Sequence, residues 1–101
     1  MSVRPSWDRL IPLFAARRGT EHARVLSERV LLLSLLAVHV RRRSPSRVTA
    51  ADLEAFVDSL PRSLRAAATD SLVEFFGFAH AEGLVRRDPA RSLARRGRRS
   101  S

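Results

Sequence analysis

Proline and glycine residues divide this chain into short segments, and each segment carries the residue spacing of an α-helix. Pro45 and Pro61 cannot continue a helix, while Gly19 and Gly83 suit the left-handed turn that ends one. No segment alternates apolar and polar residues with β-branched side chains, as a half-buried strand does. The sequence therefore predicts an all-α fold for most of its 101 residues.

Two long helical segments occupy the first half of the chain. The first runs from about Trp7 to Arg18, with Ser6 as its N-cap and Pro12 inside it, where a proline is expected to kink the helix or delay its start. The second extends from an N-cap at Thr20 to about Arg42, with an acidic residue in its first turn and arginines at its end. Both charge placements stabilise a helix through its dipole.

The second segment is apolar on nearly every side. Its longest apolar stretch, Val30–Val40, is about half of the roughly 20 residues that a membrane-spanning helix needs, so no membrane association is expected. A helix that is apolar all round belongs in the middle of a bundle. We therefore expect other helices to surround this one.

The third and fourth segments have clear local boundaries. Thr49 and Asp52 have the spacing of a shortened capping box, which opens a third helix that stops at Pro61. The fourth helix begins near Arg62 or Ser63 and reaches Gly83.

The C-terminal part is expected to be short and basic. Asp88 and Pro89 have the order of an N-cap and a first helical position, which predicts one helical turn up to Leu93. Residues 95–101 contain no apolar residue and are expected to form a flexible basic tail. Residues 1–94 are then a single folded domain.

Basic side chains outnumber acidic ones by 19 to 10, which gives a net charge of +9. Every basic residue is an arginine, a choice that GC-rich codons also produce, but codon usage does not explain the excess of bases over acids. Such an excess indicates a polyanionic partner, and guanidinium groups suit phosphate. The chain has no Cys, which excludes disulfides and thiolate metal sites, and no segment resembles a signal peptide, so a cytoplasmic location is expected.

Two stretches carry a more specific pattern. They are Val-Thr-Ala-Ala-Asp-Leu-Glu-Ala-Phe at 48–56 and Glu-Phe-Phe-Gly-Phe-Ala-His-Ala-Glu-Gly-Leu-Val-Arg-Arg-Asp-Pro-Ala at 74–90. Their order, spacing and loop lengths resemble the N-terminal core-binding domain of tyrosine recombinases, the phage-integrase family, over about Trp7 to Leu93. In that family a short helix with a Thr-x-x-Asp-Leu signal precedes a helix that ends in paired aromatics, a Glu-Gly-Leu turn and an Asp/Asn-Pro-Ala step.

The resemblance implies a four-helix, SAM-like orthogonal bundle that forms one half of a clamp around duplex DNA. In the family the other half is a catalytic domain, whose tyrosine forms a covalent link to DNA. This sequence contains no Tyr and ends where that domain would begin. We therefore expect a DNA-binding role in site-specific recombination or integration, no enzymatic activity, and a separate catalytic recombinase domain as a partner.

Family helices that match the second and fourth helices commonly lie along DNA and contact its phosphates. Carried over residue by residue, the resemblance places contacts at the starts of these helices, in the loop after the second helix and around the final turn. The DNA-binding set is Arg62, Ser63, Arg65, Arg24, Arg41, Arg42, Arg43, Arg47, Arg86 and Arg87. Each of these residues is about equally compatible with a solvated surface position. Asp70 and Glu74 occupy the middle of the fourth helix, where many relatives are basic, and weaken DNA contact unless they face away.

Other residue types predict packing and no chemistry. His22, His39 and His80 do not have the spacing of metal ligands on one helix face, and no cofactor is expected. The phenylalanines at 75, 76 and 78 could stack on unpaired bases, but aromatic residues beside leucine and alanine usually belong to a core. Trp7 is expected to pack inside the protein or against a neighbouring domain.

Two other functions stay open at this point. The apolar second helix and Trp7 suit a helical protein–protein interaction module that docks a recombinase partner, a regulator or a second copy of the chain. The basic composition alone suits a general nucleic-acid-binding protein, including an RNA binder, although the sequence contains no recognised RNA-binding motif.

Overall fold

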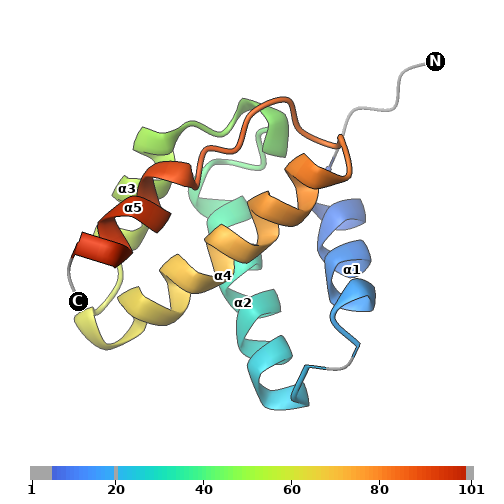
Figure 1. Ribbon diagram of the computed structural model, residues 1–101, viewed down its shortest axis with the longest axis horizontal. Helices are drawn as coiled ribbons and strands as arrows, with labels where there is room; N and C mark the ends of the chain where they lie inside the picture. Colours follow the sequence, from blue (N-terminus) through green and yellow to red (C-terminus); the bar gives the residue numbers. More distant parts are fainter. Residues whose placement is uncertain (1–5, 20, 100–101) are drawn as a thin grey trace.

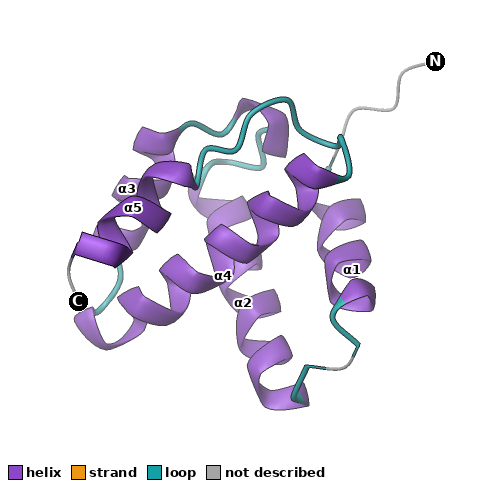
Figure 2. Ribbon diagram, viewed as in Figure 1, coloured by secondary structure: helices purple, strands orange, loops and turns teal. Residues whose placement is uncertain are grey.

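The computed structural model describes residues 6–19 and 21–99, and side chains up to residue 95. It is built from helices, and none of these residues lies in a strand (Figures 1 and 2). The elements in chain order are α1 (Trp7–Arg17), α2 (Ala23–His39), the 3-10 turn η1 (Pro45–Arg47), α3 (Ala50–Ser59), α4 (Arg62–Ala81) and α5 (Arg91–Arg99). The all-α expectation is confirmed for the described part of the chain.

The N-caps of the first two helices differ from those that the sequence predicts. α1 begins at Trp7 and continues through Pro12, so the proline does not delay its start. Ser6 stands at the N-cap, but its side chain makes no capping hydrogen bond. α2 begins at Ala23, where Nδ1 of His22 accepts a hydrogen bond from the backbone N–H of Arg24 at 3.2 Å. The expected cap, Thr20, lies outside the described residues.

α2 ends at His39 and not at Arg42, the end that the sequence predicts. Arg41 and Arg42 both have a φ of 55°, in the left-handed region that helices do not use. The turn is closed by the N–H of Arg42, which donates to the carbonyl of Ala37 at 2.7 Å. It is also tied to the core, because Nε1 of Trp7 donates to the carbonyl of Arg43 at 2.7 Å.

α3 and α4 follow their local sequence signals closely. The Thr49 hydroxyl accepts the N–H of Asp52 at 3.1 Å, and the Asp52 carboxylate accepts the N–H of Thr49 at 3.0 Å. This confirms the capping box. The confirmed boundaries after it are Pro61, which separates the two helices, and Gly83, which has a φ of 72° after the end of α4.

The C-terminal segment forms a longer helix than expected. Oδ1 of Asp88 accepts the N–H of Ala90 at 2.9 Å, but α5 begins at Arg91, so Asp88 and Pro89 precede the helix and do not occupy the predicted N-cap and first helical position. α5 then continues through Arg99, so residues 95–99 are helical in place of the expected flexible tail. Leu93 is 2% exposed, and α5 packs against α3 and α4, which explains why the helix extends beyond one turn.

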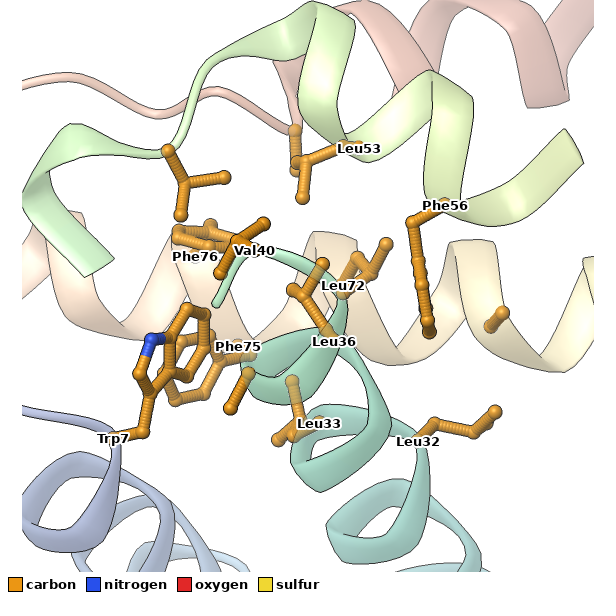
Figure 3. Packing of buried hydrophobic residues seen from close by; sticks show 14 of the residues in the cluster. Trp7, Leu32, Leu33, Leu36, Val40, Leu53, Phe56, Leu72, Phe75 and Phe76 are labelled. Atoms are coloured by element: carbon orange, nitrogen blue, oxygen red, sulfur yellow. The ribbon is translucent and has the colours of Figure 1, made fainter. Parts of the chain in front are cut away.

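α4 is the central helix and contacts each of the other four (Figure 1). Its inward side chains meet those of α1, α2 and α3 in one hydrophobic cluster (Figure 3). The fully buried members of this cluster, each 0% exposed, are Leu33, Leu36, Leu53, Ala68, Leu72, Phe75 and Phe76.

The aromatic residues pack together where α1 crosses α4. The Trp7 ring stacks on Phe75 with centroids 5.7 Å apart, and Phe75 meets Phe76 edge-on at 5.0 Å. Trp7 is 3% exposed, and Phe78 packs against the same cluster. The preference for core packing over base stacking is therefore confirmed, and Trp7 is too buried to dock a partner.

The expectation that α2 is surrounded on all sides is wrong. Leu33 and Leu36 are buried, but Leu31, Leu35 and Val38 are 59%, 43% and 63% exposed. α1, α3 and α4 contact α2 on one side and leave its outer face to solvent. In the described part of the chain, no helix combines the length and the apolar character needed to cross a membrane.

Candidate nucleic-acid interface

Two loops rich in arginine lie at one end of the molecule. One is the loop 40–49 after α2, and the other is the loop 82–90 after α4, which Figure 1 draws across the same end. Val48 of the first loop and Ala90 of the second belong to the same hydrophobic cluster. We call this region the basic end and define it by its exposed arginines, which are Arg41, Arg42, Arg43, Arg47, Arg86 and Arg87.

The loop 40–49 is held in place by one of its arginines. Arg43 donates from Nη2 to the Asp52 carboxylate at 3.1 Å and from Nε to the carbonyl of Val40 at 3.1 Å. Arg42 contacts Asp8 at 3.2 Å, but these two side chains are 64% and 87% exposed. An ion pair this exposed contributes little to stability, so Arg42 can exchange partners easily. Arg41 and Arg47 are exposed, and their guanidinium groups have no partner among the described residues.

The loop 82–90 presents its arginines from a short, fixed segment. The N–H of Leu84 donates to the carbonyl of Ala79 at 2.8 Å, and Val85 is 4% exposed. The carboxylate of Asp88 accepts the N–H of Ala90 just before α5, so it is already engaged. Arg86 and Arg87 lie between these two anchored points, exposed and without a partner among the described side chains.

The start of α4 does not join the basic end. Arg62 and Ser63 are exposed on its first turn, and the length of α4, about 30 Å at 1.5 Å per residue, separates them from the end of the helix that leads into the loop 82–90. Arg65 turns back into the protein, where Nε donates to the carbonyl of Leu60 at 3.1 Å and Nη2 to that of Asp58 at 3.0 Å. Its guanidinium group satisfies carbonyls at the end of α3.

Arg24 also lies away from the basic end. It is the second residue of α2, whose 17 residues place it about 25 Å from the loop that follows the helix. The ten residues selected from the sequence are therefore brought together only in part. Six form the basic end, and the other four lie at the starts of α2 and α4.

The two acidic residues in the middle of α4 are paired within the protein. Glu74 forms an ion pair with Arg18, and Asp70 forms one with Arg29 at 2.9 Å. The middle of α4 thus presents compensated charges and not a continuous acidic surface.

Arg29 is a structural residue that the sequence reasoning missed. Its side chain is 12% exposed, forms an ion pair with Glu21 and lies 3.5 Å from the hydroxyl of Ser71. Burial lowers the pKa of the Arg29 guanidinium, but the bonds to Glu21 and Asp70 outweigh burial, and the pKa lies above its ordinary value. A signal existed, because Arg29 shares a helical face with the buried residues Leu33, Leu36 and Val40.

The described arginines fall into two groups. The first group contacts carboxylates or backbone carbonyls and comprises Arg17, Arg18, Arg29, Arg42, Arg43 and Arg65. In the described part of the chain, the second group is exposed and makes no side-chain hydrogen bond or ion pair; it comprises Arg9, Arg24, Arg41, Arg47, Arg62, Arg86, Arg87, Arg91 and Arg95. The basic end holds four of these nine, Arg41, Arg47, Arg86 and Arg87.

No protein-family model, no curated protein and no solved structure matches this chain. The described residues also contain no cluster of three or more His, Asp or Glu side chains that could hold a metal ion. The arrangement of the arginines is therefore the feature from which a function can be argued.

Proposed function

We propose that this protein binds duplex DNA through phosphate contacts made by the basic end. In this proposal the helices form a SAM-like orthogonal bundle that corresponds to the core-binding half of a tyrosine-recombinase clamp and acts in site-specific recombination or integration in the cytoplasm. The observation that carries the proposal is the group of four exposed, unpartnered arginines on two adjoining loops.

The chemistry of these loops favours phosphate as the ligand. A guanidinium group presents a planar set of donors that matches two phosphate oxygens, and carboxylates near the basic end are already engaged. Asp8 contacts Arg42, Asp52 contacts Arg43, and Asp88 accepts the N–H of Ala90. The positive charge of Arg41, Arg47, Arg86 and Arg87 is therefore not neutralised locally.

The ion pairs along α4 make the two loops of the basic end better candidates for DNA contact than the middle of that helix. Because Asp70 and Glu74 are held by Arg29 and Arg18, the middle of α4 has little net charge to offer a phosphate backbone. Contacts to phosphate position a protein on DNA without reading its sequence. We therefore expect modest sequence selectivity, with a second arm supplied by a separate catalytic domain.

The test is a fluorescence-anisotropy titration of a short labelled DNA duplex at several salt concentrations. The first variant is Arg86→Gln/Arg87→Gln, which removes two charges from the basic end. The matched control, Arg24→Gln/Arg62→Gln, removes two charges from the starts of α2 and α4, where both arginines are also exposed and have no partner among the described residues. Circular dichroism verifies that both variants are folded.

The wild type is expected to bind with a dissociation constant of roughly 10⁻⁴ to 10⁻⁶ M that rises steeply with salt. Removing one arginine–phosphate interaction reduces the slope of log K against log salt by about 0.9, so the slope of the basic-end variant should fall by about 1.8 and that of the control by much less. Equal reductions in the two variants would show a diffuse polycation and overturn the proposed interface. Tighter binding to an RNA duplex of the same length would favour the alternative of an RNA-binding protein.

A further inference from the structure

α5 carries a run of positive charge that no acidic residue of the same helix balances. Five of its nine residues are arginines, and none is Asp or Glu. The loop 82–90 leads directly from the basic end into this helix (Figure 1). α5 therefore adjoins the basic end and carries charge of the same sign.

Two arginines, Arg91 and Arg95, define the outer face of α5. Ala90, just before the helix, and Leu93 are 1% and 2% exposed and belong to the hydrophobic cluster, on the side where α5 packs against α3 and α4. Arg91 and Arg95 are both exposed. They are four residues apart, so they share one face of the helix and are separated by about 6 Å along its axis.

The folded chain by itself gains no stability from these two charges. In the described part of the chain, neither Arg91 nor Arg95 forms a side-chain hydrogen bond or ion pair. Like charges four residues apart on a helix repel each other. Arg91 is also the first residue of α5, where the helix dipole opposes a cation. A negatively charged ligand on this face removes both costs.

We propose that the outer face of α5 is a second contact surface for duplex DNA, and that the duplex extends from the basic end along this helix. DNA carries one negative charge per about 1.7 Å of its axis, so a duplex that reaches the basic end also has phosphates to offer along the roughly 14 Å of α5. This inference rests on the proposed DNA binding, but it assigns contacts outside the two loops that form the basic end.

A salt series of anisotropy titrations with the labelled duplex tests the contact. Arg91→Gln and Arg95→Gln each remove one charge from the outer face and are expected to reduce the slope of log K against log salt by about 0.9, and by about 1.8 when combined. Arg24→Gln is the matched control, because Arg24 is exposed and unpartnered in the described part of the chain but lies at the start of α2. It is expected to leave the slope unchanged. Arg95→Lys keeps the charge and is expected to keep the wild-type slope.

Hydrogen exchange of the wild-type protein locates the contact without any substitution. With free duplex at ten times its dissociation constant, about one molecule in ten is unbound, so amides of residues 91–95 that exchange only in the unbound protein should exchange about tenfold more slowly. Amides in the first turn of α2 that exchange by local opening should keep their rates. Equal slowing of the two segments, or no slowing in α5, overturns the proposed contact.

The titrations distinguish failure of this inference from failure of the proposed function. If Arg86→Gln/Arg87→Gln reduces the slope and the α5 variants do not, the basic end remains the DNA site and the contact with α5 is overturned. If only the α5 variants reduce the slope, the contact with α5 is supported and the basic end is overturned as the interface. A wild-type protein that does not bind the duplex overturns both proposals, and equal reductions in Arg24→Gln and the α5 variants overturn a contact specific to α5.

Discussion

The charge cluster around Arg29 makes a stability prediction whose size can be worked from its surroundings. The Arg29 side chain is 12% exposed and lies between Glu21, which is 16% exposed, and Asp70, which is 61% exposed. Replacing Arg29 by Met keeps most of the apolar stem and removes the charge and its donors. Glu21 then keeps one arginine, because Arg18 lies 3.5 Å from its carboxylate.

Two limits bracket the expected cost. Breaking a buried ion pair by removing one partner costs about 3–5 kcal/mol, whereas an exposed pair contributes about 1 kcal/mol or less. Glu21 is mostly buried but retains Arg18, and Asp70 can return to water. We therefore expect Arg29→Met to lower the free energy of unfolding by about 2–3 kcal/mol, a large part of the roughly 5–15 kcal/mol that a domain possesses.

Urea unfolding followed by far-UV circular dichroism measures this difference. Arg24→Met is the control, because Arg24 is exposed on the same helix and has no partner among the described side chains, so its cost should stay within about 0.5 kcal/mol. Double-mutant cycles with Glu21→Gln and Asp70→Asn should give the larger coupling energy for Glu21, since that pair is better buried.

If Arg29→Met and Arg24→Met have the same free energy of unfolding, the cluster around Arg29 contributes nothing to stability. A coupling energy that is larger for Asp70 than for Glu21 would refute the argument from burial. An Arg29→Met variant more stable than the wild type would mean that desolvation of the charges costs more than their pairing returns.

Two further predictions concern Asp52 and Arg41. The backbone N–H of Thr49 and the guanidinium of Arg43 hold the pKa of Asp52 below its ordinary value of 3.8, so its contribution to stability is present above that pH and is lost as pH falls through the lower folded pKa. Asp52→Asn should therefore destabilise the protein at neutral pH, with a gap from wild type that narrows in acid, whereas a gap independent of pH would contradict this. Arg41 has a φ of 55°, so Arg41→Gly should be more stable than Arg41→Ala by about 1 kcal/mol in urea unfolding. Equal stabilities would show that the turn relaxes.

The ends of helices could be predicted from the sequence where they depend on residues close by in the chain. The Thr49 and Asp52 capping box, the stop at Pro61 and the left-handed Gly83 each depend on a few neighbouring residues. The end of α2 was not predictable in this way. Arg41 favours a helix by its own propensity, but the hydrogen bond from Trp7 to the following loop fixes a turn there, and that bond joins residues 36 positions apart.

The residue type of the candidate site could be predicted from the sequence, but the positions of its arginines could be predicted only in part. The excess of arginine is plain in the sequence, but which arginines are free depends on partners far along the chain. Arg65 looked like a phosphate ligand, yet carbonyls at the end of α3 accept its hydrogen bonds. The exposed outer face of α2 was also not predicted. The apolar sequence of this helix indicates how much apolar surface it has, but it does not indicate how many other helices are available to cover that surface.

The loop 40–49 is fixed at two points before any ligand arrives. Trp7 holds the carbonyl of Arg43, and Asp52 holds the Arg43 side chain. A loop ordered in advance loses little conformational entropy when it binds, so more of its contact energy is left as affinity. Charges at fixed separations also respond to the shape of a polyanion and not only to its charge density. If the basic end binds nucleic acid as proposed, we expect it to distinguish between nucleic acids of equal charge by their groove geometry, which a flexible arginine tail would not do.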